Sequence, residues 1–191
     1  MKMKIFILFV LIAYSILIAC SSSSKPDNEI KATGPTRDIS KAVSTPRPTT
    51  PDHLKLVTLE DGEKILGEPA HITDSMMSTQ PNIVVYKSTY TANAGTEATR
   101  GNVYFVFEDY KHQADAETKY AFIKASNEAN AGFEELKGLG DEAYFHTDKK
   151  NFYFIMLRKK TKVVAMKVSK ITPKTSEKAF REVAERIAET L

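Results

Sequence analysis

The sequence is poor in the residues and motifs that build most reaction centres. It contains one cysteine and four histidines in 191 residues, and no two histidines stand at metal-ligand spacing on one expected element. No His-Glu-x-x-His pattern, Gly-x-Ser-x-Gly elbow or phosphate-binding P-loop occurs, and nothing marks a serine or lysine as an activated nucleophile. The sequence therefore predicts no catalytic residue, no metal site and no cofactor, and it leaves a small hydrolase as the least favoured function. The histidines are His53, His71, His112 and His146.

The longest apolar run stands at the start of the chain. Lys2 and Lys4 make a cationic head, and the fifteen residues 5–19 that follow are apolar except for Tyr14 and Ser15. A transmembrane helix needs about 20 apolar residues, whereas a secretory signal needs a charged start and an apolar stretch of about 7–15 residues. The run therefore predicts a signal peptide over residues 1–19, with an uncleaved anchor as the alternative.

The single cysteine follows this run directly. Leu17-Ile18-Ala19-Cys20 resembles the lipobox of bacterial lipoproteins, in which an obligatory cysteine follows a small residue. The resemblance implies that diacylglycerol is attached to the Cys20 sulfur and that the chain is cut between Ala19 and Cys20. A thiol suits the first step because it is the best nucleophile near neutral pH. Lipidation leaves no free thiol, which excludes disulfides and thiolate metal sites.

The same resemblance implies a location in the cell envelope. Two or three acyl chains would make attachment to the membrane effectively permanent, because each buried CH₂ contributes about 0.8 kcal/mol. Ser21 stands where an aspartate signals inner-membrane retention in enterobacterial lipoproteins. The periplasmic face of the outer membrane is therefore favoured if the host has two membranes.

Composition separates a tether from a domain. Five of the eight prolines and eleven serines or threonines lie in residues 21–51, a composition that buries too little apolar surface to offset the entropy of ordering. We therefore expect a lipidated cysteine and disordered tether over residues 20–51. Loss of Lys2 and Lys4 with the signal changes 27 basic and 24 acidic residues into 25 and 24. This balance predicts no general affinity for nucleic acid.

Residues 52–191 have the composition of a single α+β domain. A capping box at Thr58 starts a first helix and Gly67 ends it. A third helix, capped by Ser176, carries an amphipathic stripe from Phe180 to Leu191. The expected order is α-β-β-α-β-β-β-α, an antiparallel sheet of about five strands with three helices. The second helix is expected over residues 112–131, and strands over 83–91, 103–107, 152–157 and 163–168. A further, brief strand is expected at the end of residues 138–145.

The segment "GLGDEAYF", residues 138–145, predicts a turn with Gly138 and Gly140 at positive φ that leads into a strand. Together with the element order, it resembles uncharacterised small α+β envelope lipoproteins. That resemblance implies a binding or scaffolding domain and no catalytic residue. Asp141, Glu142 and His146 are close enough for acid–base work. The favoured interpretation is that the two acids solvate the outer edge of the turn.

Two patterns are candidate contact sites. The basic run "RKKTK" at residues 158–162 either binds lipid phosphates or another polyanion, or is a solvated hairpin tip that discourages edge-to-edge aggregation. The segments "VYFVF" (103–107) and "NFYFIML" (151–157) carry apolar groups on both faces. Either helices cover both faces of the sheet, or one face is an exposed patch for a partner or an apolar ligand. The candidate ligand or partner contacts are Tyr104, Phe154, Arg158, Lys159 and Lys160.

Taken together, these features favour a membrane-anchored envelope lipoprotein whose domain is a binding or scaffolding module. It would contact the membrane through its lipid and bind an unknown envelope protein or an apolar ligand. The alternative is a carrier or chaperone for a hydrophobic molecule. That function requires an open apolar cleft of more than a few hundred Å³ between sheet and helices.

Overall fold

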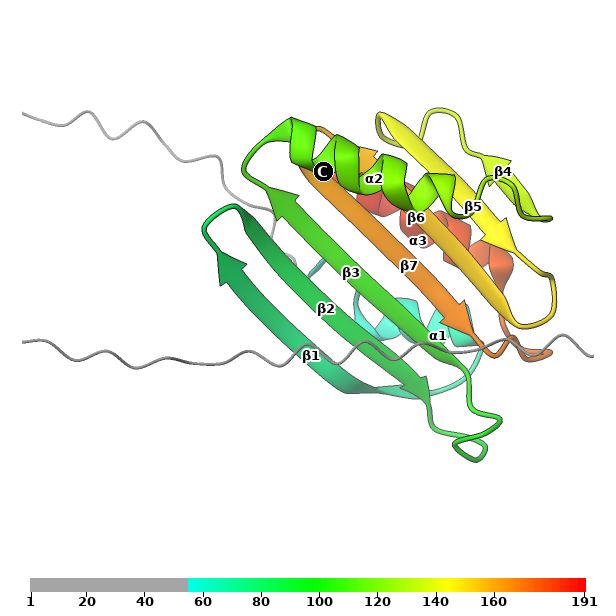
Figure 1. Cartoon of the computed structure of the whole chain (residues 1–191). Coiled ribbons are helices and arrows are strands. Elements are labelled where there is room, and N and C mark those ends of the chain that lie inside the picture. Colours follow the sequence, from blue (N-terminus) through cyan, green and yellow to red (C-terminus); the bar gives the residue numbers. More distant parts are fainter. Residues whose placement is uncertain (1–54) are drawn as a thin grey trace, which may run out of the picture. The chain divides into compact units, whose positions relative to one another are not determined.

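The computed structural model describes residues 55–191 and has an α+β fold (Figure 1). The expected signal peptide, Cys20 and the tether over 20–51 lie outside the described residues. Three helices and an antiparallel sheet are present in this part of the chain, as the sequence predicts, but the sheet has seven strands rather than about five. No helix between residues 55 and 191 is long and apolar enough to span a membrane. The elements are α1 (Leu59–Leu66), β1 (Ala70–Gln80), β2 (Ile83–Ala92), β3 (Asn102–Tyr110), α2 (Gln113–Ala125), β4 (Phe133–Glu135), β5 (Glu142–Thr147), β6 (Phe152–Lys159), β7 (Lys162–Ser169) and α3 (Glu177–Thr190).

The two strands that the sequence did not predict are the edges of the sheet. The strand order is β1-β2-β3-β7-β6-β5-β4, and every neighbouring pair is antiparallel. β1 reads AHITDSMMSTQ and is exposed along almost its whole length, so it carries no alternation of buried and exposed residues that would identify a strand. β4 has only three residues, which is too short for a pattern. Pairing with β2 and β5 makes these segments strands.

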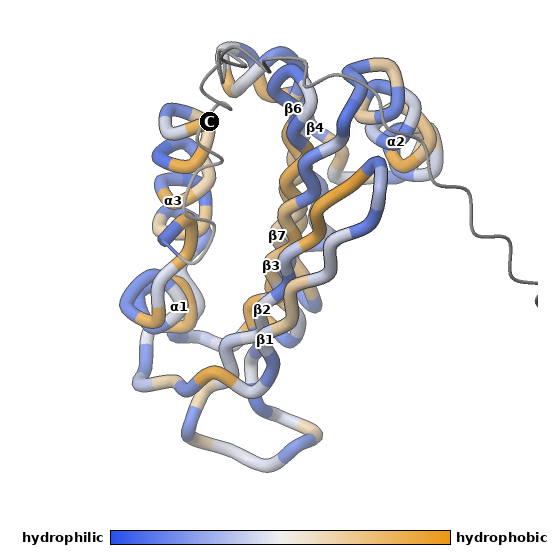
Figure 2. Tube along the Cα trace, turned by 90° about the vertical axis from the view of Figure 1, so that its left-hand side faces the viewer, coloured by the Kyte–Doolittle hydropathy of each residue, from blue (hydrophilic) through white to orange (hydrophobic). Residues whose placement is uncertain are grey.

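One face of the sheet carries the main core, which α1 and α3 cover (Figure 2). Phe105 and Phe107 from β3 and Phe180 from α3 are fully buried there. The capping box at Thr58 is present, Gly67 ends α1 in the left-handed conformation, and Ser176 caps α3. The structure thus confirms these three predictions. Each was predictable because a helix cap depends on residues only a few positions apart.

Helix α2 lies on the other face (Figure 2) and packs on only part of it. Its buried residues Ala116 and Tyr120 contact a second, smaller cluster made by Tyr144, Met156 and Val163. The helix ends at Ala125 rather than near 131. The Asn127 side-chain amide donates to the Ile123 carbonyl at 2.7 Å, and such side-chain bonds compete with continuation of a helix.

Candidate functional site

The candidate functional site is the part of the second sheet face that α2 leaves uncovered, which we term the open face. Side chains alternate between the two faces of a strand. The strand register places Tyr104 of β3 beside Lys167 of β7, and Lys167 beside Phe154 of β6. It also places Lys87 of β2 beside Met76 of β1 on the same face. The two aromatic residues expected as contacts, Tyr104 and Phe154, are thus brought onto one surface, two strands apart.

The open face combines apolar groups with ammonium groups. Tyr104 is 41% exposed and Met76 is 46% exposed, and Lys87 and Lys167 are exposed. Phe154 is half-buried, because it packs against the cluster under α2 and borders the open face there. The Lys167 Nζ lies 5.7 Å from the centroid of the Phe152 ring, within the range of a cation–π contact. Such a surface suits a partner that offers apolar side chains together with carboxylates.

A shallow pocket of about 530 Å³ lies where α2 meets the start of β2 and the end of β3, lined in part by Ile83, Tyr110 and Phe122. Phe122 projects from α2 and is 74% exposed. Burial raises the pKa of Tyr110 well above its usual value, and the hydrogen bond from its hydroxyl to Glu108 adds to this effect. The hydroxyl therefore stays protonated, and its one hydrogen is donated to Glu108 at the edge of an apolar surface.

The basic run at 158–162 is not a free cationic patch. Arg158 is buried. Its Nε donates to Glu142 Oε2 at 2.8 Å and its Nη1 to Asp141 Oδ2 at 3.0 Å. Lys159 Nζ donates to the Ala188 carbonyl at the end of α3, at 2.9 Å. Lys160 is exposed, so of the three basic residues expected as contacts it is the accessible one.

The polar cluster expected near the glycine turn is divided in the structure. Asp141 and Glu142 bind Arg158, whereas His146 Nδ1 pairs with Asn127 Oδ1 at 3.1 Å. Gly138 and Gly140 both have positive φ, of 79° and 70°, as the sequence predicts. The carboxylates therefore neutralise a buried guanidinium rather than share a site with the imidazole. Among the described residues no group of three or more His, Cys, Asp or Glu side chains has the geometry of a metal site.

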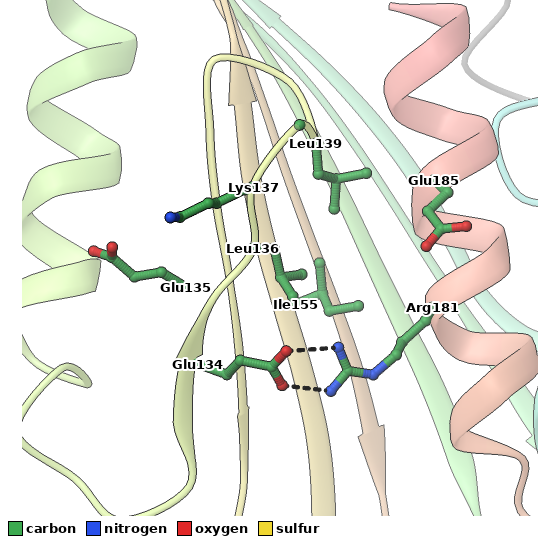
Figure 3. A pocket seen from close by; sticks show the side chains of 9 residues that line it. Glu134, Glu135, Leu136, Lys137, Leu139, Ile155, Arg181 and Glu185 are labelled. Carbon is green, nitrogen blue, oxygen red and sulfur yellow. Dashed lines mark hydrogen bonds and ion pairs between the residues drawn. The ribbon is translucent and has the colours of Figure 1, made fainter.

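A second pocket, of about 450 Å³, lies between α3 and the loop that joins β4 to β5 (Figure 3). Arg181 and Glu134 face each other across it, with Nη2 and Oε2 2.7 Å apart. Arg181 also donates to Glu177 at 3.0 Å and stacks 3.9 Å above the Phe145 ring. Its hydrogen-bonding groups are used within the protein, so Arg181 supports the fold and is not a spare cation for a ligand.

Two tyrosines between α2 and the sheet, Tyr120 on the helix and Tyr144 on β5, are almost fully buried. Burial raises the pKa of Tyr144 to about 12 and raises that of Tyr120 further. The Tyr144 hydroxyl lies 3.3 Å from the Asn127 amide and 3.7 Å from the Met156 sulfur. Both phenols are neutral at physiological pH, and their position between the helix and the sheet assigns them to packing.

Sequence reasoning identified only part of this site. Met76 was missed because β1 was not expected, and Lys87 and Lys167 were missed because isolated lysines on strands resemble ordinary solvent-facing residues. Phe122 carried a signal, since a large aromatic side chain stands between Tyr120, which is buried, and Ile123, which is partly buried. Comparison of the chain with protein-family models, with curated proteins and with solved structures finds no match.

Proposed function

We propose that the chain is a lipid-anchored lipoprotein of the cell envelope whose domain binds a partner protein through the open face. The sequence Leu17-Ile18-Ala19-Cys20 after a short apolar run supports the anchor. The observation that carries the binding function is the arrangement of Tyr104 and Lys167 on a surface that α2 does not cover, with Phe154 beside Lys167 at the border of the cluster under α2. The domain would act as a binding or scaffolding module at the membrane.

The anchor is tested by the intact mass of the protein isolated from its own cells. We expect a chain that begins at Cys20 and carries diacylglycerol on sulfur. A Cys20→Ser variant should keep its signal segment and lose the lipid mass, because serine does not supply the thiol. An unmodified thiol, or a native chain that still starts at Met1, would refute the anchor.

The composition of the open face favours a protein as the partner. Interfaces between proteins are enriched in aromatic side chains and methionine, and their rims are polar. The open face has Tyr104, Phe154 and Met76 in such a setting, with Lys87 and Lys167 between them. Among the described residues, no pocket is found that Tyr104, Lys167 or Met76 lines, whereas a small molecule needs a concave site to bury most of its area.

The binding function is tested by photo-crosslinking in the native envelope. A benzoylphenylalanine residue at position 104 should give an adduct of one defined mass. The same residue at position 59 is the control, because Leu59 is also a large apolar side chain, 39% exposed, but lies on α1. A Lys167→Glu substitution beside position 104 should reduce the adduct at least tenfold if a carboxylate of the partner contacts that lysine. Equal adducts from positions 104 and 59 would contradict the proposal.

Carriage of an apolar ligand is the second candidate function, and the pocket beside Phe122 supports it. Its volume of about 530 Å³ exceeds the few hundred Å³ that a carrier requires, and its lining includes Ile83 and Tyr110. Binding of a fluorescent fatty-acid analogue that is lost in Phe122→Ser and kept in Tyr104→Ser would favour this function over protein binding.

A further inference from the structure

The outer edge of β1 is the longest unpaired strand edge in the described part of the chain. β1 has eleven residues and ends the strand order of the sheet, so β2 is its only neighbour between residues 55 and 191. In Figure 1 it is the outermost strand, and no helix or other strand of the domain lies along its outer side. Ile72, Met76 and Met77 are about half exposed on it. An exposed, apolar and extended edge is a template for pairing with another strand.

The register identifies the backbone groups that point outward. Lys111 N–H donates to the Asn82 carbonyl and Ala92 N–H to the Gly101 carbonyl, so even-numbered residues of β2 bond to β3. Odd-numbered residues of β2 therefore bond to β1. After the bulge of β1, their partners there are Asp74, Met76, Ser78 and Gln80. Because hydrogen-bonding direction alternates along a strand, the N–H and C=O groups of Ser75, Met77 and Thr79 face away from the sheet.

Nearer the start of β1, the outer edge is occupied. A bulge between Ile72 and Asp74 shifts the alternation, and Ala70 N–H points outward there. It donates to the Glu63 carboxylate of α1 at 3.1 Å. From Asp74 to Gln80, residues 55–191 supply no such partner, and this stretch contains no lysine, arginine or proline, the residues that commonly protect an edge.

The opposite edge of the sheet is protected in the usual way. β4 has three residues, and two of them are glutamates. Glu134 pairs with Arg181 and Glu135 with Lys124. A short, charged edge of this kind resists pairing with another strand. Of the two sheet edges, only that of β1 is therefore suited to pair with a further strand.

We propose that β1 pairs with β1 of a second copy of this chain, antiparallel, about a two-fold axis at Met77. In this register Met77 faces its own copy, Met76 faces Ser78, and Ser75 faces Thr79. Asp74 faces Gln80, so the carboxylate of one copy meets an amide of the other and no like charges oppose each other. This self-complementarity over seven residues is the reason for choosing a second copy as the partner.

The pairing supplies a bond to each outward backbone group named above. Ser75 and Thr79 exchange both of their hydrogen bonds across the axis, and Met77 exchanges both with its copy. The Met77 side chains become neighbours on one face, and apolar pairs of this kind stabilise adjacent strands. The inference depends only on the edge of β1, so it holds or fails independently of the lipid anchor and of the open face.

Site-specific disulfide formation tests the register. The full chain carries Cys20→Ser, is purified in detergent, and contains one introduced cysteine as its only thiol. Directly opposed Met77 residues would have Cα atoms about 5.5 Å apart, within the range that a disulfide spans. Met77→Cys should therefore give a covalent dimer on mild oxidation. Thr79→Cys is the matched control, because it lies on the same strand and face but about 14 Å from its copy, and it should stay monomeric.

Two further variants separate pairing from misfolding. Thr79→Pro removes an N–H that points outward, which an edge strand tolerates, so the domain should keep its circular dichroism spectrum while the Met77→Cys dimer is lost. A mixture of Ser75→Cys and Thr79→Cys chains should form a mixed dimer. No dimer from Met77→Cys, or equal dimer from Met77→Cys and Thr79→Cys, would overturn the proposal.

Discussion

The paired glycines before β5 allow a prediction whose size follows from the structure. Gly138 and Gly140 have nearly the same backbone conformation, with φ of 79° and 70°. An alanine at either position costs about 1–2 kcal/mol, because a Cβ is disfavoured in the left-handed region. At Gly138 an added Cβ meets no atom within 4 Å. We therefore expect Gly138→Ala to lower the free energy of unfolding by only about 1–2 kcal/mol.

Gly140 has the same conformational cost and a steric one in addition. A Cβ there would lie 2.6 Å from the Arg158 carbonyl oxygen, which already accepts a 2.8 Å hydrogen bond from Asp141 N–H. Relieving the contact requires the turn to move away from β6 and weakens that bond, which costs about 1–2 kcal/mol more. We therefore expect a total loss of about 3 kcal/mol for Gly140→Ala.

Urea unfolding followed by circular dichroism measures both losses in the soluble chain that begins at Ser21. The dependence of unfolding free energy on urea should be unchanged, since neither variant alters the surface that unfolding exposes. Equal losses for the two variants, or a larger loss for Gly138→Ala, would refute the steric argument and the placement of the turn against β6.

Three further outcomes test other parts of the domain. The raised pKa of Tyr144, about 12 against an ordinary value near 10, means that only the unfolded state releases this proton between pH 10 and 12. Stability should therefore fall with rising pH in that window, and Tyr144→Phe should reduce the slope in alkaline urea titrations. Thr58→Ala should cost about 1 kcal/mol in thermal unfolding, through loss of the capping box. Arg158→Met should cost about 1–2 kcal/mol in urea unfolding, because Asp141 and Glu142 lose their cation but remain partly hydrated.

The sequence alone predicts those helices and strands that are marked by residues close together in the chain. The helix α1 is bounded by Thr58 and Gly67, and α3 begins at Ser176, because a cap depends on a few consecutive residues. Central strands such as β3 and β6 are recognisable since most of their side chains are apolar. β1 lacks this signal: it is polar, exposed on both faces, and is a strand because β2 pairs with it.

The candidate site shows a different limit. The apolar groups on both faces of residues 103–107 correctly indicate that side chains are buried on both faces of the sheet. The pattern does not reveal how much of the second face α2 covers. Tyr144 and Met156 are buried under α2, while Tyr104 on the same sheet face is 41% exposed. Likewise, the run at 158–162 looks like a cationic patch until the fold brings Asp141 and Glu142 to Arg158. Both distinctions depend on contacts between residues far apart in the chain.

The two proposed surfaces are connected through Met76. A two-fold axis normal to the sheet keeps the same face upward in both copies, so pairing of β1 would place the two open faces side by side. Met76 lies on the open face and also within the paired stretch, whereas Tyr104 lies on β3, two strands from the edge. Met76→Glu should therefore impair both the Met77→Cys dimer and the crosslink from position 104, because it places carboxylates near the junction and on the open face. Tyr104→Glu should affect the partner and leave the dimer intact. Loss of the dimer in Tyr104→Glu would show that the two surfaces are not separate.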